Sequence, residues 1–146
     1  MVLEEQLGYF FFDKQLLKRS LTSAAYAQEQ ASPTENQEAY SLLGSAILDT
    51  VLTELLIRQG HGTQSAIVSH KLELKQIENL ARISQDVGIG YVIKLSQAEK
   101  DQRAYDNPLV LAAALEAVIA GIYLDGGFAA ARRAIHHLFK DVFPAE

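Results

Sequence analysis

Apolar residues recur along this chain at intervals of three and four, the spacing of one face of an α-helix, and strict alternation of apolar and polar residues is scarce. The pattern therefore predicts an all-α fold. We expect six helices: a short one that carries Leu3 and Leu7, one after Asp13 that includes Leu21, and one each over about residues 33–59, 63–88, 108–124 and 128–139.

Polar and glycine-containing sequences mark the ends of these helices. Ser32-Pro33-Thr34-Glu35 has the form of a capping box with proline at the first helical position, which favours a helix start near residue 33. Gly60-His61-Gly62 ends that helix, and Asp125-Gly126-Gly127 separates the last two helices. We expect residues 91–95 to form an extended or helical link without a pairing strand, and residues 96–107 to form a mobile loop.

The composition fits one globular domain over residues 1–146, because 49% of the residues are hydrophobic and 21% are charged. The absence of cysteine excludes disulfide frameworks, thiolate metal sites and cysteine nucleophiles. The longest apolar stretch, residues 109–124, is short for a bilayer span and contains Glu116, so we predict a buried helix there. Since the first residues also lack the features of a secretory signal, we expect a cytoplasmic protein without membrane contact.

The net charge of −5 changes the picture for nucleic-acid binding. Proteins that grip nucleic acid usually carry a basic excess, because neutralising phosphates supplies most of the affinity. Any RNA contact by this chain therefore needs a local basic patch. The candidates are two strips, Lys71 with Lys75 and Arg132 with Arg133, although a solvated helix face is the default interpretation of both strips.

Two segments carry a resemblance to a known family. Residues 36–48 have the sequence N-Q-E-A-Y-S-L-L-G-S-A-I-L, and residues 111–127 have the sequence L-A-A-A-L-E-A-V-I-A-G-I-Y-L-D-G-G. The first resembles the N-E-R-L-E-F-L-G-D-A-V-L helix of ribonuclease III proteins, and the second resembles their L-A-D-A-L-E-A-x-I-G-A-I-Y-L-D-G-G segment. The resemblance implies a helical bundle like the ribonuclease III endonuclease domain, without a double-stranded RNA-binding domain.

Members of that family cut double-stranded RNA as homodimers, using Mg²⁺ held by acidic residues of two helices. Mg²⁺ prefers anionic oxygen ligands in octahedral geometry, which explains the acidic residue types. The resemblance places the four ligand positions at Ser41, Ser45, Ala113 and Glu116, so only Glu116 is a carboxylate here. Glu38 matches a family glutamate that lies near the metal without usually binding it. A single carboxylate is a poor magnesium site, and we expect no cofactor.

These replacements predict a catalytically inactive, homodimeric factor that associates with RNA or a ribonucleoprotein in RNA processing. One alternative is a weakly active Mg²⁺-dependent ribonuclease that uses Glu38, Asp49 or Asp125, and another is a protein-interaction module without an RNA role. Glu116 itself fits a structural glutamate paired with a nearby donor or across the dimer better than a residual ion site. Leu42 occupies a position where the family commonly has a phenylalanine that inserts into the partner subunit.

Ser41 and Ser45 lie one helical turn apart in this prediction. Activated-serine chemistry requires a neighbouring base, and no histidine or lysine falls on the same face of their helix. We therefore expect the two serines to fill space that the family gives to carboxylates. His136 and His137 are adjacent, so they point in different directions from a helix and do not form a chelating pair.

Overall fold

The computed structural model describes residues 2–144, and helices account for its regular structure. Its elements are α1 (Val2–Leu7), α2 (Lys14–Ser20), α3 (Ala24–Glu29), α4 (Glu38–Arg58), α5 (Gln64–Leu74), α6 (Ile77–Val87), α7 (Ile89–Val92), α8 (Gln97–Asp101), the 3₁₀-helix η1 (Ala104–Asp106) and α9 (Pro108–Leu138). Within this range the one β-type pairing is an isolated parallel bridge between Thr22 and Lys94. The prediction of an all-α fold is confirmed.

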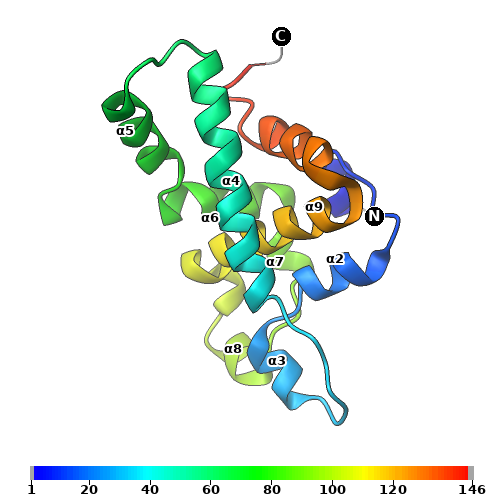
Figure 1. The fold of residues 1–146 in the computed structure, drawn as a ribbon. Coiled ribbons are helices and arrows are strands. Elements are labelled where there is room, and N and C mark those ends of the chain that lie inside the picture. Colours follow the sequence, from blue (N-terminus) through cyan, green and yellow to red (C-terminus); the bar gives the residue numbers. More distant parts are fainter. Residues whose placement is uncertain (1, 145–146) are drawn as a thin grey trace.

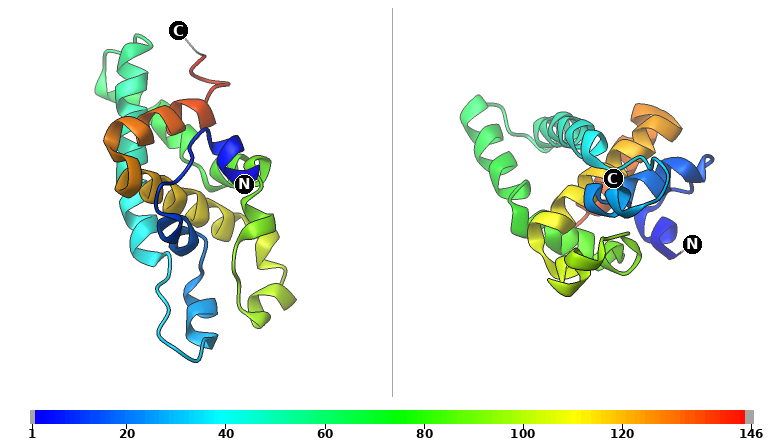
Figure 2. Two further views of the ribbon diagram at one scale, coloured as in Figure 1. Left: turned by 90° about the vertical axis from the view of Figure 1, so that its right-hand side faces the viewer. Right: turned by 90° about the horizontal axis from the view of Figure 1, so that it is seen from below.

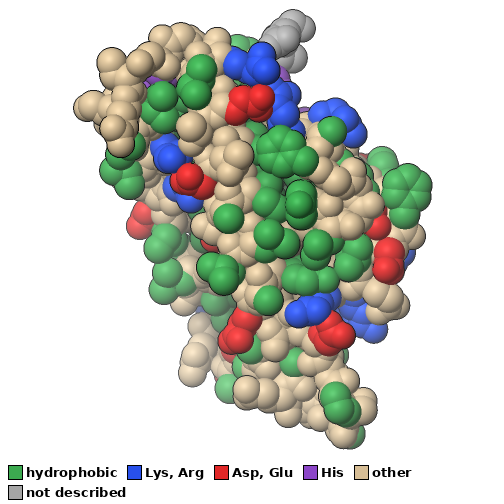
Figure 3. All heavy atoms as spheres, in the orientation of Figure 1, with side chains coloured by type: hydrophobic (Ala, Val, Ile, Leu, Met, Phe, Trp, Pro, Cys, Tyr) green, Lys and Arg blue, Asp and Glu red, His purple; other side chains and the backbone are tan. Residues whose placement is uncertain are grey.

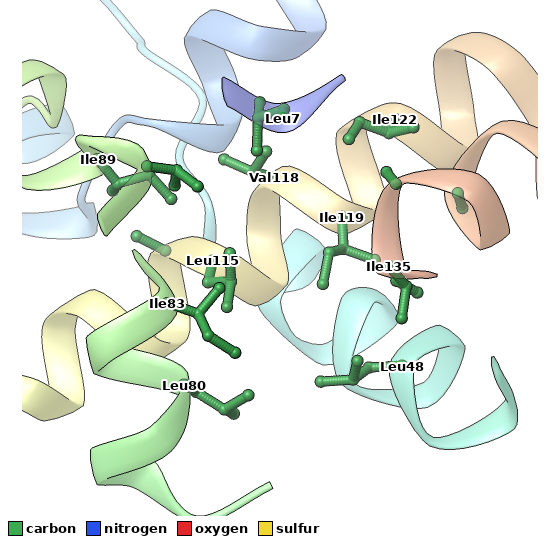
Figure 4. Close-up of a cluster of buried hydrophobic side chains, with 14 of the residues drawn as sticks. Leu7, Leu48, Leu80, Ile83, Ile89, Leu115, Val118, Ile119, Ile122 and Ile135 are labelled. Carbon is green, nitrogen blue, oxygen red and sulfur yellow. The ribbon is translucent and has the colours of Figure 1, made fainter. Parts of the chain in front are cut away.

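Helix α9 runs through the middle of the molecule, and α4, α6 and α2 pack around it (Figures 1 and 2). Most residues of its first part between Leu111 and Ile122 are buried, as expected for a helix that neighbours cover on most sides. Figure 4 shows the resulting core, in which α1, α4, α6, α7 and α9 contribute the labelled side chains Leu7, Leu48, Leu80, Ile83, Ile89, Leu115, Val118, Ile119, Ile122 and Ile135.

Helices α4 and α9 are each long and apolar enough to cross a membrane, judged by length and composition alone. Both helices supply the core of this bundle, and they pack directly against each other. Core burial therefore gives a sufficient reason for their apolar composition.

Helix α9 changes direction at Gly127, whose φ of 85° and ψ of 178° lie outside the helical region. Glycine adopts a positive φ at little cost, which is why the kink falls at this residue. The predicted boundary at Asp125-Gly126-Gly127 is thus confirmed as the junction between two helical segments. After the kink, Arg132 forms an ion pair with Glu54 of α4, which joins the second segment to the rest of the bundle.

Helix α4 begins at Glu38, so the predicted start near residue 33 is wrong, and Ser32-Pro33-Thr34-Glu35 forms no capping box. The backbone N–H of Gln37 donates to the carbonyl of Thr22 at 2.9 Å, which fixes the entry to α4 against the end of α2. The side chain of Asn36 accepts from the N–H of Glu38 at 2.9 Å. Residues 28–35 are exposed, so no burial of apolar surface rewards an earlier helical turn.

The predicted helix over residues 63–88 consists of two helices, α5 and α6, separated at Lys75 and Gln76. Gln76 adopts a ψ of 141°, and the side chain of Asn79 donates to the carbonyl of Leu74 at 2.8 Å. This hydrogen bond satisfies an orphan carbonyl at the end of α5. The break lets α6 pack against α9 while α5 lies beside α4 (Figure 1).

Residues 96–107 contain α8 and η1, so the prediction of a loop there is wrong. Ser96 and Glu99 form a reciprocal capping box that starts α8. The preceding link does find a pairing partner, because the N–H of Lys94 donates to Leu21 at 2.7 Å and the N–H of Ser23 donates back to Lys94 at 3.0 Å. Sequence periodicity missed these short elements because local capping, rather than an apolar stripe, defines them.

Candidate functional site

Helices α4 and α9 cross in direct backbone contact. A Cβ atom placed on Gly44 of α4 would lie 1.6 Å from the carbonyl oxygen of Glu116 on α9, so only glycine fits at this point. One turn away, the Ser41 hydroxyl donates to the carbonyl of Ala113 at 2.8 Å. Ser45 is hydrogen-bonded to the Glu116 carboxyl group. The four positions that the resemblance assigns to metal ligands therefore meet at one place.

Glu116 is partly buried among apolar residues of α9. Burial raises the pKa of its carboxyl group, while the Ser45 hydroxyl and the positive charge of Lys75 act in the opposite direction and only partly offset that rise. Burial disfavours the ionised form because the surrounding protein solvates charge less well than water does. The carboxylate at the crossing is thus short of stabilising partners.

Two lysines from the end of α5 reach the same region. The Lys75 ammonium lies 3.5 Å from the carbonyl oxygen of Ser45 and 3.4 Å from a carboxylate oxygen of Asp49. The Lys71 ammonium lies 3.2 Å from the other Asp49 oxygen and 3.1 Å from the Thr53 hydroxyl. Burial alone would raise the pKa of Asp49, but the two lysines together hold it below its usual value.

The approach of Lys75 to this site was not predicted. The predicted absence of a neighbouring base concerned the face of the helix that carries Ser41 and Ser45, whereas Lys75 is the C-cap of a neighbouring helix. The spacing of Lys71 and Lys75 places both lysines on one face of a helical turn and offered a signal. The sequence alone did not show that Asp49 lies opposite that face.

The donor groups at the crossing do not fit a magnesium site. The Ser41 hydroxyl donates its proton to a backbone carbonyl, and the Ala113 side chain has no atom that can bind a metal. Glu116 is the one carboxylate of the four positions. Within residues 2–144, no group of three or more histidine, aspartate or glutamate side chains is arranged to hold a metal ion. Mg²⁺ needs several oxygen ligands, preferably anionic, and an ammonium group at the same place opposes it.

The other acidic candidates occupy different positions. Glu38 is exposed in the first turn of α4 and lines a surface pocket of about 510 Å³ together with Ser41 and Ala113. Asp125 accepts hydrogen bonds from the Tyr9 hydroxyl at 2.6 Å and from the backbone N–H groups of Phe12 at 2.8 Å and Asp13 at 2.9 Å. Protein donors thus surround Asp125, and Glu38 borders the crossing on its open side.

The basic candidates differ in what they face. Lys71 and Lys75 both contact Asp49, and Arg132 is paired with Glu54. Arg133 is exposed on the second segment of α9. Of these four residues, Arg133 therefore presents its charge to solvent most directly.

Known proteins share the sequence pattern of this chain over most of its length. Residues 13–142 match the family described as ribonuclease-III-like. The chain belongs to the ribonuclease III family. Its nuclease-type fold and its relation to this family, both expected from residues 36–48 and 111–127, are confirmed.

Among curated relatives, the chain is 32% identical to ribonuclease 3 from Caldanaerobacter subterraneus subsp. tengcongensis over 96% of this chain and 62% of the relative. It is 34% identical to ribonuclease 3 from Nitratiruptor sp. over 97% of this chain and 61% of the relative. The chain therefore spans about three fifths of the length of these relatives.

Among solved structures, two of the nuclease domain of ribonuclease III from Campylobacter jejuni match closely. One, described for flexibility in a region involved in dimer formation, has a TM-score of 0.89 at 30% identity and covers 99% of this chain and 98% of that domain. The other has a TM-score of 0.86 at 30% identity and covers 99% of this chain and 96% of that domain. The agreement extends over the whole arrangement of helices.

Proposed function

We propose that this chain is a homodimeric ribonuclease III-type factor in RNA processing that associates with RNA or a ribonucleoprotein without cutting it. The observation that carries the proposal is the crossing of α4 and α9. Of the four positions that the family uses for metal ligands, Glu116 alone is a carboxylate, and it has Ser45 and the charge of Lys75 as its neighbours. The chemistry of this donor set does not support binding of a hydrated Mg²⁺ ion.

Cleavage of double-stranded RNA tests the catalytic part of the proposal. The chain is incubated in excess over labelled duplex RNA with Mg²⁺ or Mn²⁺, beside an active ribonuclease 3 as a positive control. We expect intact substrate after times at which the control has cut all of its RNA. Discrete products that disappear when EDTA is added would reject the proposal that the chain is catalytically inactive.

Weak nuclease activity is the alternative, and the names of the relatives favour it, since they are called ribonuclease 3. In that case Glu116, Asp49 and Glu38 are the carboxylates available around the crossing. Glu116→Ala would then abolish cleavage by the chain, and Asp125→Asn, which changes a carboxyl group elsewhere, would leave the rate per folded molecule unchanged. Cleavage that survives Glu116→Ala would point to a contaminating nuclease.

The homodimer is proposed from the exposed face of α4. Leu42 is 77% exposed, although it belongs to a long helix whose other face supplies the core. Exposed apolar side chains also gather beside α4 on the face shown in Figure 3. An adjoining pocket is lined partly by Leu109, Val110 and Ala113. Burial of such a surface against a second copy removes apolar area from water, which stabilises association.

Sedimentation of matched variants tests the dimer. Leu42→Glu would place a charge within the proposed interface, so we expect it to sediment as a monomer at concentrations where the unaltered chain is a dimer. Leu72→Glu is the control, because Leu72 on α5 is also strongly exposed, at 67%. A dimer that persists in Leu42→Glu, or a monomeric unaltered chain, would contradict the proposal.

RNA association separates this proposal from a protein-interaction module. Gel-shift titrations with duplex RNA at low and moderate salt would show binding that weakens as salt rises, because phosphate contacts release counterions. Arg133→Glu should weaken that binding, since Arg133 is exposed. If the chain shows no salt-sensitive binding even at low ionic strength, the RNA role is lost and the interaction module is preferred.

A further inference from the structure

Helix α5 has few apolar contacts to hold it in place. Of its eleven residues, only Leu74 is buried, and the helix lies at the side of the bundle next to α4 (Figures 1 and 2). Its polar contacts with α4 are concentrated near its C-terminal end, where Lys71 and Lys75 reach Asp49. The two lysines are therefore placed to fix α5 against α4.

The two ammonium groups also balance charge near the helix crossing. Asp49 and Glu116 supply two carboxylates, and Lys71 and Lys75 supply two ammonium groups. The side chains of Lys71 and Lys75 are only 20% and 23% exposed, so water screens these charges less than it screens those on the open surface. The two lysines thus offset the charge of these two carboxylates, whereas Glu38, on the open side of the crossing, is exposed to water.

We propose that the Lys75 ammonium is a built-in cation beside the family's metal-ligand positions, where its charge offsets that of the remaining carboxylate and opposes metal binding. The inference rests in part on the proposed loss of the metal site. Lys75 both docks α5 against Asp49 and supplies a positive charge next to the ligand position at Ser45.

Lys75 fits this role better than Lys71 does. Lys75 Nζ contacts the backbone carbonyl of Ser45, one of the four ligand positions, whereas Lys71 Nζ contacts Thr53, eight residues further along α4. Lys75 also lies close enough to Glu116 for its charge to act on that carboxyl group. Lys71 is therefore a matched control that carries the same charge on the same helix.

The test restores one carboxylate and asks whether Lys75 prevents metal binding. Ser45→Asp places a second carboxylate beside Glu116, because the Ser45 side chain already contacts that group. Mn²⁺ binding is measured by the electron paramagnetic resonance signal of the free ion in Ser45→Asp, Ser45→Asp/Lys75→Met and Ser45→Asp/Lys71→Met. We expect the Lys75 double variant to bind Mn²⁺ at least about tenfold more tightly than Ser45→Asp alone, and the Lys71 double variant to gain clearly less.

Equal Mn²⁺ affinity in Ser45→Asp with and without Lys75→Met would overturn the inference, as would equal gains from Lys71→Met and Lys75→Met. Circular dichroism melts accompany each variant to establish that it is folded. A second measurement uses the otherwise unaltered chain: its melting temperature should not differ between EDTA and millimolar Mg²⁺, and Lys75→Met should lower it. A rise of the melting temperature with Mg²⁺ in the unaltered chain would count against the built-in cation.

These outcomes separate the inference from the proposed function. Cleavage of RNA by the unaltered chain rejects catalytic inactivity whatever the affinity for Mn²⁺. Unchanged Mn²⁺ affinity after removal of Lys75 rejects the built-in cation even if no RNA is cut.

Discussion

Two carboxyl groups on the first part of α9 have opposite surroundings. Asp125 accepts three hydrogen bonds, from the Tyr9 hydroxyl and from two backbone N–H groups, and these bonds hold its pKa below the usual value against the effect of burial. The Ser45 hydroxyl and the charge of Lys75 act on Glu116, but burial outweighs both and keeps its pKa above the usual value. One acid is stabilised as an anion by the protein, and the other is not.

The difference shows that carboxylates contribute differently to stability depending on whether protein donors or a metal ion balance their charge. Asp125 ties the segment that follows α1 to the first part of α9, just before the kink, so its charge contributes to folding directly. The carboxylates of a magnesium site repel one another until a cation binds, and they therefore add little to folding by themselves. Replacing them with serine and alanine, as at Ser41, Ser45 and Ala113, leaves a crossing that is held by close packing.

The largest effect is expected from breaking that close packing. Gly44→Ala would place a Cβ atom 1.6 Å from the Glu116 carbonyl oxygen, and a backbone atom cannot move aside without separating α4 from α9. We expect destabilisation of about 3 kcal/mol or more, or failure to fold. Urea unfolding measures it, with Gly62→Ala as the control, because a Cβ on Gly62 meets nothing within 4 Å. Similar midpoints for the two variants would mean that the crossing is looser than described.

The second variant, Asp125→Asn, should lower the free energy of unfolding at pH 7 by about 2 kcal/mol. The amide lacks the negative charge that the three hydrogen-bond donors face, and its NH₂ group points toward some of these donors. The pKa of Asp125 lies below its usual value of 3.8, so its contribution is present above that pH and is lost as the pH falls through the folded-state pKa. Urea midpoints at pH 7 and pH 3 measure both effects. An Asp125→Asn protein as stable as the unaltered chain at pH 7 would remove the contrast with Glu116.

Tyr9, the hydrogen-bond partner of Asp125, tests the same contacts at high pH. Burial, the hydrogen bond to Asp125 and the Asp125 charge raise the pKa of Tyr9 to about 12. A raised pKa stabilises the fold below the unfolded value of about 10, and this stabilisation is lost as the pH rises toward 12. We expect the unaltered chain to lose about 1–2 kcal/mol more than Tyr9→Phe between pH 9 and pH 11.5. Parallel pH profiles of the two proteins would show that Tyr9 titrates normally.

The sequence predicted the parts of the fold that long-range periodicity governs. The long helices that carry Leu48 and Leu115 were expected from their apolar spacing, and the break at Gly127 was expected from the glycine pair. The predicted start of α4 was wrong because the carbonyl of Asn36 accepts from Arg19 of α2 and the N–H of Gln37 donates to Thr22 just after α2, contacts that local capping rules do not include. The short helix α8 was missed for a different reason, because the Ser96–Glu99 capping box defines it without an apolar stripe.

At the site, the residues that the family resemblance assigns to one place do lie together, but the approach of Lys75 to them was not predicted. Ser41, Ala113 and Glu116 meet as the resemblance implied, because two regular helices transmit the family spacing into space. Lys75 lies at the end of a third helix, α5, and this end was predicted to lie inside one longer helix over residues 63–88. A residue that reaches a site across a helix break cannot be placed by the spacing of one helix.

The smallest effect, and the one of opposite sign, is expected from Glu116→Gln. This change removes the same charge as Asp125→Asn, but burial has raised the pKa of Glu116 above its usual value of 4.5, so at pH 7 the ionised form opposes folding. We expect stability at pH 7 to be unchanged or higher by less than about 1 kcal/mol.

The pH dependence of Glu116→Gln provides the stricter measurement. A raised pKa contributes stability that is fully present below 4.5 and is lost as the pH rises through the folded-state pKa, so the unaltered chain should gain on Glu116→Gln as the pH falls from 7 to 4.5. Its advantage over Asp125→Asn should shrink as the pH falls further. Opposite slopes from the same acid-to-amide change would establish that the two carboxyl groups have different surroundings. If Glu116→Gln destabilised the chain as much as Asp125→Asn does, Glu116 would instead be an anion that the protein stabilises.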